Sequence, residues 1–264
     1  MLIRELLTIS AVDGPHRRES LIGLVYAYHA AGSLAARLGI PGMPTLAADR
    51  LRDVANELGD PVWIGVAAWS RAHFLSGANR LRQYELAVRV ADEAPAEQPE
   101  TRGMANLTAA LASSARGDDD LAQTHLREAA ALAELIEPDV SSWPTGLMNF
   151  GRTNVGIWRL SIAVELGWGA RVDELAADIR PETIGVSRQA AFWLDYGRGL
   201  VAERKTRARG IAAIMRAEKL APQQIRNNVW ARETVAGLLA ATRRDAGGRD
   251  LRGLAWRLGV APTG

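Results

Sequence analysis

The run Phe-Trp-Leu-Asp-Tyr at 192–196 places a carboxylate and a phenol among apolar side chains. Asp195 is the most conspicuous charge in the sequence, because a carboxylate buried there requires a partner such as Arg198 or a ligand cation. Together with His73, Asp195 and Tyr196 could hold a substrate and supply one proton transfer. These three residues are the catalytic candidates if the protein is an enzyme.

The sequence lacks the motifs of the common enzyme classes. It has no His-Glu-x-x-His, no Gly-x-Ser-x-Gly, no phosphate-binding Gly-Lys-Ser/Thr and no dinucleotide-binding glycine pattern. The acidic cluster at 118–120 lacks the later Gly and Glu of a calcium loop, and acids are favoured in a first helical turn. We therefore expect neither a metal nor a cofactor.

Binding residues are easier to nominate. Aromatic walls with a few polar groups are typical of small-molecule sites, and an Asn amide can hold a peptide backbone through its donor and its acceptor. In a helical-repeat array the first helix of each hairpin lines the concave groove. Residues of these types on the expected first helices, or on the approach to them, are Trp69, His73, Asn106, Trp143, Asn149, Asn154, Trp158, Trp193, Asp195 and Arg198.

Composition is that of an ordinary globular chain. Of 264 residues, 48% are hydrophobic and 23% are charged, which suffices for a sizeable core. The absence of Cys excludes disulfides and thiolate chemistry. No apolar run approaches the roughly 20 residues of a membrane span, and the first five residues include a charge pair where a signal peptide would be apolar. We expect a cytoplasmic protein without a membrane partner.

Charge is distributed unevenly along the chain. Residues from Arg198 onward include 14 Lys and Arg against 5 Asp and Glu, so this part carries +9 and the remainder −7. A basic C-terminal third could face nucleic acid or an acidic partner. Basic residues on solvated helix faces are the favoured interpretation.

Apolar residues recur at spacings of three and four nearly everywhere, which predicts an all-α protein. The series Gly59-Asp60-Pro61 predicts that one helix stops and the next starts within three residues. Tight turns are also expected at 77–79 and 116–118. The predicted helices are 2–9, a long helix ending at 38, 45–58, 61–75, 81–93, 101–116, 118–135, 153–166, 172–179, 187–203, 208–220, 229–244 and 249–258.

Two hairpins share a pattern of small and large residues. With Pro222 as the last residue of a repeat, the packing positions are Leu194, Gly210, Ile214 and Ala217. The hairpin at 103–134 gives matching offsets at Ala110, Gly117, Ala122, Leu126 and Ala129. This is the tetratricopeptide pattern of about 34 residues. It predicts a right-handed α-solenoid of antiparallel helical hairpins, forming a single domain over 1–264 with an irregular hinge at about 137–152.

Several segments also resemble a known family. They are 46–52, 58–61, 122–126, Phe-Gly-Arg-Thr-Asn-Val at 150–155, 164–167, 217–222 and 251–260. They are similar to the sensor region of actinobacterial XRE-type helix-turn-helix transcriptional regulators. In that family a DNA-binding domain precedes a tetratricopeptide-like sensor. This chain shows no helix-turn-helix ahead of the repeats, and Arg152 and Trp158 replace the Pro and His that are frequent in the family.

The resemblance implies a ligand-sensing module that binds a small molecule or a short peptide in its concave groove, with the stretch 148–166 as hinge and floor. Nucleic acid would be reached only through an absent DNA-binding domain, and a homodimer is compatible with this role. A stand-alone enzyme of specialised metabolism that uses the same Trp-lined pocket is the first alternative. A protein-interaction scaffold is the second.

Overall fold

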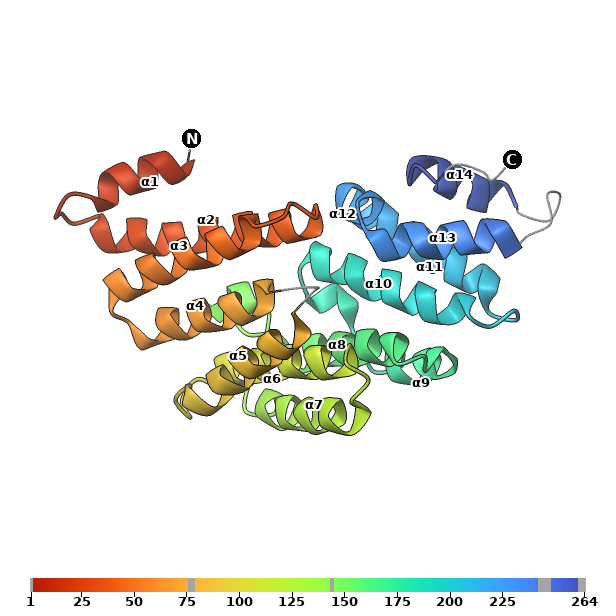
Figure 1. Cartoon of the computed structure of the whole chain (residues 1–264), viewed down its shortest axis with the longest axis horizontal. Coiled ribbons are helices and arrows are strands. Elements are labelled where there is room, and N and C mark those ends of the chain that lie inside the picture. The colour runs from red at the N-terminus through yellow and green to blue at the C-terminus, as the bar shows by residue number, and fades with distance from the viewer. Residues whose placement is uncertain (1, 76–78, 143–144, 242–247, 261–264) are drawn as a thin grey trace. The chain divides into compact units, whose positions relative to one another are not determined.

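The protein is all-α. The computed structural model describes residues 2–75, 79–142, 145–241 and 248–260 (Figure 1). These residues form fourteen α-helices and three short 3-10 helices, and no strand occurs among them. Neighbouring helices pack pairwise as hairpins, as the apolar periodicity predicts. The chain divides into two compact units, Met1–Val155 and Gly156–Gly264.

The first unit is built from the helices before Val155. They are α1 (Leu2–Ser10), α2 (Arg17–Arg37), α3 (Met43–Leu58), α4 (Pro61–Phe74), α5 (Arg80–Glu93), α6 (Pro99–Ser114), α7 (Asp119–Ala133) and the 3-10 helix η1 (Thr145–Met148).

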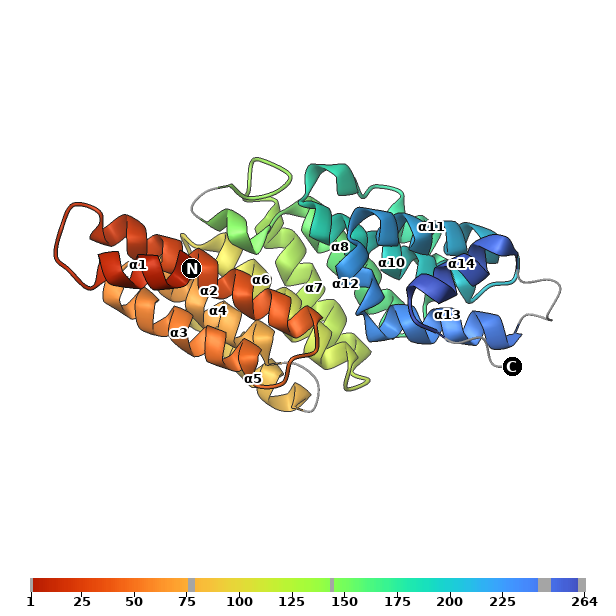
Figure 2. The ribbon, with the colours of Figure 1, turned by 90° about the horizontal axis from the view of Figure 1, so that it is seen from above.

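The second unit begins inside α8 (Arg152–Glu165). It continues with η2 (Gly169–Arg171), α9 (Val172–Ala176), η3 (Pro181–Thr183), α10 (Val186–Val201), α11 (Arg207–Leu220), α12 (Pro222–Arg226), α13 (Val229–Ala241) and α14 (Arg249–Arg257). The last two of these lie side by side (Figure 2).

Local turn chemistry sets the boundaries in the first unit. Gly59 ends α3 in the left-handed region with φ 63°, and the Asp60 side chain accepts a hydrogen bond from the Val62 amide at 3.0 Å. Pro61 occupies the first turn of α4, where its missing N–H costs nothing. The prediction that one helix ends and the next begins within residues 59–61 is confirmed.

The turn between α6 and α7 follows the same logic. Gly117 has φ 77°, and the Asp118 carboxylate accepts a hydrogen bond from the Leu121 amide at 3.1 Å. This N-cap accounts for the first acid of the cluster at 118–120. Of the turn predicted at 77–79, only Asn79 belongs to the described residues, and its side chain caps α5 through the Arg82 amide at 3.0 Å.

Several predicted boundaries were wrong, and in two of the three cases that follow the cause is a proline in a first helical turn. Helix α3 begins at Met43 rather than at residue 45, because Pro44 fits the first helical turn. A short helix, α12, starts at Pro222, where we expected only a stop, and it buries Ile225 completely. Helix α9 ends at Ala176, three residues earlier than predicted.

Two glycines allow α10 and α11 to approach closely. A Cβ on Gly197 would lie 2.8 Å from the carbonyl oxygen of Gly210, and a Cβ on Gly210 would lie 2.8 Å from the carbonyl oxygen of Gly197. A Cβ on Gly199 would lie 2.4 Å from the Val172 side chain. The pair Gly197 and Gly199 is therefore a packing site.

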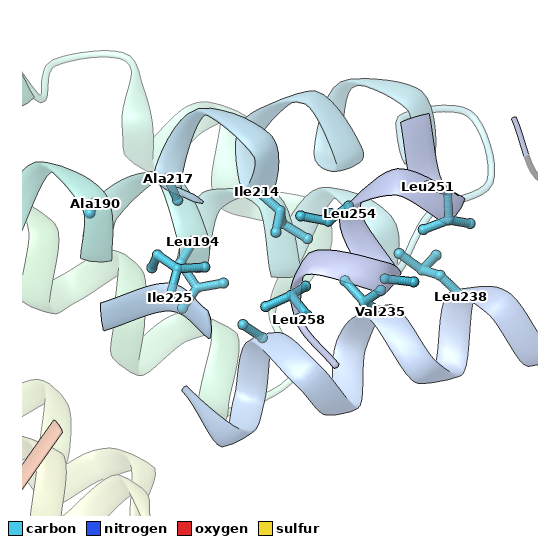
Figure 3. Close-up of a cluster of buried hydrophobic side chains, with 12 residues drawn as sticks. Ala190, Leu194, Ile214, Ala217, Ile225, Val235, Leu238, Leu251, Leu254 and Leu258 are labelled. Atoms are coloured by element: carbon cyan, nitrogen blue, oxygen red, sulfur yellow. The ribbon is translucent and has the colours of Figure 1, made fainter. Parts of the chain in front are cut away.

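The core of the second unit joins α10 through α14 (Figure 3). The repeat positions Leu194, Ile214 and Ala217 lie in it, and all three are buried. Its further members are Ala190, Ile225, Ala231, Val235, Leu238, Leu251, Leu254, Ala255 and Leu258.

The irregular segment before α8 is fixed by several contacts within the first unit. The Arg152 guanidinium donates to the carbonyl oxygens of Ile136 and Glu137 at 3.0 and 2.9 Å and pairs with Asp139 at 3.2 Å. Gly151 has φ 145°, and a Cβ there would lie 2.3 Å from the Asp139 carbonyl oxygen. Only glycine fits this close approach.

Candidate functional site

A polar seam joins the two first helices of the second unit, α8 and α10. We define it by three side-chain pairs. The Arg188 guanidinium lies over the Trp158 ring, 5.4 Å from its centroid. The Ser161 hydroxyl donates to the Asp195 carboxylate, and Arg198 donates to Glu165 at 2.9 Å.

The order of the pairs gives the direction of the helices. Positions 158, 161 and 165 of α8 meet positions 188, 195 and 198 of α10, so both numbers rise together and the two helices run parallel. The spacings of three and four on α8 place its three side chains on one face. First helices of successive hairpins have this parallel relation in a helical repeat.

Asp195 is the centre of the seam. Its side chain retains 15% exposure, and one carboxylate oxygen lies 3.0 Å from the Arg198 guanidinium. Burial raises the pKa of Asp195, and this effect outweighs the opposing effects of Arg198, Ser161 and Arg188. The ionised carboxylate is therefore less favourable here than in water, despite its partners.

Arg198 connects the seam to Trp230 on α13. Its guanidinium binds both Glu165 and Asp195 and also lies over the ring of Trp230 on α13, at 5.3 Å from the centroid. Trp230 is 51% exposed. The Arg198 side chain is 13% exposed, so the exposed surface at this end of the seam is mainly that of Trp230.

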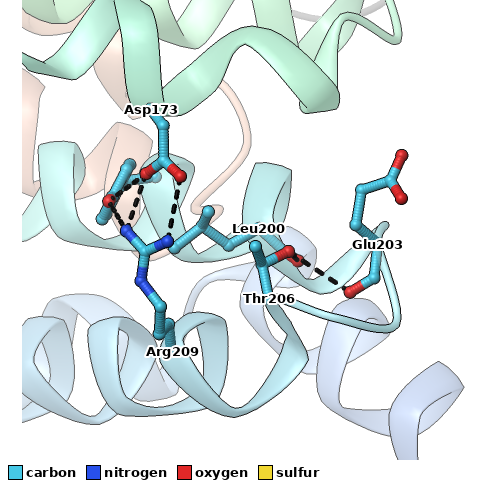
Figure 4. A network of polar contacts seen from close by, with 6 residues as sticks. Asp173, Leu200, Glu203, Thr206 and Arg209 are labelled. Carbon is cyan, nitrogen blue, oxygen red and sulfur yellow. Dashed lines mark hydrogen bonds and ion pairs between the residues drawn. The ribbon is translucent and has the colours of Figure 1, made fainter.

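Tyr196, the neighbour of Asp195, belongs to a different network. Its hydroxyl donates to the Asp173 carboxylate at 2.6 Å, and Arg209 binds the same carboxylate through two hydrogen bonds of 2.8 and 2.9 Å (Figure 4). Burial and the Asp173 carboxylate together raise the pKa of Tyr196. Asp195 and Tyr196, the two catalytic candidates on α10, therefore belong to separate polar networks.

Trp193 faces α11 rather than α8. The Arg216 guanidinium lies 3.8 Å from the centroid of its ring, and the rings of Phe192 and Tyr196 pack at 5.1 and 5.9 Å. The buried indole N–H of Trp193 has no hydrogen-bond partner among the described residues. Trp193 is half-buried and therefore combines an apolar wall with an adjacent positive charge.

The first unit contains an aromatic stack on its own first helices. Trp69 and His73 of α4 stack at 5.1 Å between ring centroids, and His29 of α2 stacks on Trp69 at 5.6 Å. The indole N–H of Trp69 donates to the Thr108 hydroxyl of α6 at 3.2 Å. Burial, with a contribution from the Arg37 charge, lowers the pKa of His29 to about 4.

Asn106 of α6 contacts His125 of α7. Its side-chain oxygen lies 2.8 Å from Nδ1 of His125, whose Nε2 lies 3.4 Å from the Tyr84 hydroxyl. The Asn106 amide nitrogen also donates to the Arg102 carbonyl oxygen at 3.0 Å. Asn106 is thus fully engaged within the first unit.

The two other asparagines predicted to bind a ligand, Asn149 and Asn154, have contacts within the protein. Asn149 adopts the left-handed region with φ 53°, which Asn tolerates, and its amide donates to the Leu147 carbonyl oxygen at 3.2 Å. Asn154 is 1% exposed and lies 3.8 Å from the Met104 sulfur. Trp143 lies outside the described residues.

The structure therefore brings together some of the predicted site residues and separates others. Asp195, Arg198 and Trp158 share the α8–α10 seam, whereas Trp69, His73 and Asn106 belong to the first unit. Sequence reasoning did not place Ser161, Glu165 or Trp230 in this site. Spacings of three and four place Ser161 and Glu165 on the same face of α8 as Trp158, but this spacing does not identify their partners on α10.

Comparison with known proteins gives no relative. No protein-family model, no curated protein and no solved structure matches the chain. Among the described residues, no helix has both the length and the apolar character needed to cross a membrane.

Proposed function

We propose that the chain is a ligand-sensing helical-repeat module of a transcriptional regulator, and that its ligand, a small molecule or a short peptide, binds at the α8–α10 seam. The observation that carries this proposal is the environment of Asp195. Its raised pKa means that the ionised form of this nearly buried carboxylate is less favourable in the folded protein than in water, although Ser161 and Arg198 both contact it. A group that costs stability suggests a role in binding.

The seam also suggests what the ligand would carry. The Arg198 guanidinium can donate hydrogen bonds to a ligand carboxylate, and the Asp195 carboxylate can accept them from an ammonium or another donor. Trp230 offers an exposed aromatic face beside Arg198. A zwitterion such as an amino acid derivative or a short peptide would satisfy all three groups.

Binding at the seam would act on the angle between two helices. Every seam pair connects α8 to α10, so a ligand that takes either Asp195 or Arg198 replaces a contact between the helices with one to itself. The helices would then adopt a different spacing, which is the kind of two-state element that a sensor needs. The resemblance to sensor regions of XRE-type regulators supports the same role.

The binding test is Trp fluorescence of the native protein, titrated with fractions of cell extract and with synthetic short peptides. A saturable change in the wild type that is lost in Asp195→Asn supports the proposal. Glu233→Gln, which alters an exposed carboxylate on α13, is the matched control and should bind as the wild type does. Equal saturation of wild type and Asp195→Asn would place the ligand elsewhere.

The fate of the ligand distinguishes the sensor from an enzyme. A sensor returns its ligand unchanged, whereas an enzyme that used Asp195, Tyr196 and His73 would release an altered compound. The separate networks of Asp195 and Tyr196 favour the sensor. Failure to find any ligand would favour the interaction scaffold.

A further inference from the structure

The C-terminal helix α14 carries a large aromatic side chain in solvent. Trp256 is 82% exposed, more than any other of the large hydrophobic residues exposed in the described chain. Its helix is nevertheless firmly packed, because Leu251, Leu254 and Leu258 on the opposite face lie in the core of the second unit (Figure 3). The exposure of Trp256 therefore does not come from a loosely attached helix.

An ion-pair clasp holds α14 in addition to this apolar packing. The Glu218 carboxylate of α11, whose side chain is 7% exposed, binds Arg257 of α14 at 2.9 Å and Arg226 of α12 at 2.7 Å. Burial alone would raise the pKa of Glu218, but the two arginines outweigh it and lower the pKa. Three helices are thus fixed to one another by a single ionised carboxylate.

The exposed face of α14 is basic as well as aromatic. Arg249, Arg252 and Trp256 follow one another at spacings of three and four, so they share one face, and all three are exposed. A Cβ on Gly253, beside Trp256, would meet only the Arg257 guanidinium within 4 Å. Of the three arginines of α14, Arg249 and Arg252 lie on this face, whereas Arg257 is paired with Glu218.

We infer that this face of α14 is a docking surface for an acidic polypeptide segment that inserts an apolar side chain beside Trp256. Tryptophan and arginine are the residues most enriched among the anchors of protein interfaces. The charges of Arg249 and Arg252 on this face favour an acidic partner and increase its rate of encounter. The surface does not depend on the ligand proposed above.

A nucleic acid is the less suitable occupant of the same face. Single strands are bound by several aromatic platforms in succession along a basic groove, and α14 offers one exposed aromatic residue. Double-stranded DNA is bound through many phosphate contacts, whereas the exposed row offers two arginines next to the acidic Asp250. One aromatic anchor flanked by two cations matches a polypeptide.

The test is a display selection of random peptides on the intact protein, followed by binding of the enriched peptides in solution. Enriched peptides should be acidic with at least one large apolar residue, and Trp256→Ala should weaken their binding about tenfold or more. Leu135→Ala, which removes another exposed apolar side chain at 69% exposure, should leave binding unchanged.

A second variant tests the clasp and leaves Arg249, Arg252 and Trp256 in place. Glu218→Gln should weaken peptide binding because α14 is held less firmly, while Trp256→Ala should leave the free energy of unfolding unchanged. The proposal is overturned if no acidic peptide is enriched, or if enriched peptides bind Trp256→Ala as they bind the wild type. Binding of a single-stranded oligonucleotide that Trp256→Ala abolishes would assign the face to nucleic acid instead.

Discussion

The Ser161 hydroxyl of α8 donates a hydrogen bond to the Asp195 carboxylate of α10, and the two residues are 34 positions apart in the chain. This separation equals the length of a tetratricopeptide repeat, about 34 residues. Equivalent positions on successive first helices therefore lie side by side. In this protein one such pair holds a carboxylate that is nearly buried.

Asp195→Asn is expected to raise the free energy of unfolding at neutral pH. The raised pKa of Asp195 shows that its ionised form is less favourable in the folded protein than in the unfolded chain, and the amide removes that charge while keeping the shape. Urea denaturation of both proteins measures the difference. A clear loss of stability in Asp195→Asn would instead show that the Asp195 carboxylate stabilises the fold.

The same residue predicts a pH dependence with a definite sign. The folded protein holds the Asp195 proton more tightly than the unfolded chain, whose pKa is the ordinary 3.8. Stability relative to Asp195→Asn should therefore fall as pH rises from about 3.8 through the raised folded value. Unfolding free energies of the two proteins, measured across this range, check the sign, and a difference that is independent of pH would contradict it.

The contribution of Glu218 to stability should depend on pH with the sign opposite to that of Asp195. Its folded pKa is lowered below the ordinary 4.5, so its contribution is present at neutral pH and is lost as pH falls through the folded value. We expect Glu218→Gln to destabilise the protein at neutral pH by about 1–3 kcal/mol, because two arginines lose a buried partner. Denaturant titration at neutral and acidic pH tests this, and a penalty that persists at low pH would argue against the ion pairs.

The close approach of α10 and α11 predicts that alanine substitutions at Gly210 and at Gly237 have opposite effects on stability. Gly210→Ala would place a methyl group 2.8 Å from the Gly197 carbonyl oxygen and should cost about 1–3 kcal/mol. Gly237→Ala on α13 meets nothing within 4 Å and should stabilise the protein by about 0.5–1 kcal/mol through helix propensity. Thermal unfolding of both variants measures the two changes in stability. Equal changes in stability would contradict the close approach of α10 and α11 at Gly210.

The imidazole of His29 should remain neutral to about pH 4. Its lowered pKa comes first from burial against Trp69 and Phe74 and then from the Arg37 charge. Nuclear magnetic resonance titration of the histidine ring protons, with His29→Gln to assign the signal, measures this directly. A midpoint near the ordinary value of 6.5 would show that the ring is solvated.

The sequence predicted the fold better than the site, and particular residues show why. Gly59, Asp60 and Pro61 act locally, so their effect on the chain can be inferred without tertiary structure. The starts of α3 at Met43 and of α12 at Pro222 were missed because Pro44 and Pro222, unlike Pro61, were interpreted as stops, although proline fits the first helical turn.

The site depends on which helix faces meet, and this is not a local property. Asp195 could be recognised from its apolar neighbours, and its partner Arg198 lies within one turn. Ser161 and Glu165 could not be assigned to Asp195 and Arg198 without the alignment of α8 beside α10. Trp193 and Tyr196, close in sequence to Asp195, point to other partners because each residue rotates the helix by about 100°.

The central claim is that the α8–α10 seam binds a ligand, and native mass spectrometry of the wild-type protein beside Asp195→Asn tests it most directly. Both proteins are purified without denaturation and incubated with the same extract fraction. We predict an added mass on the wild type that is absent from Asp195→Asn and is released unchanged when the complex is denatured. An added mass that both proteins retain equally would contradict the account.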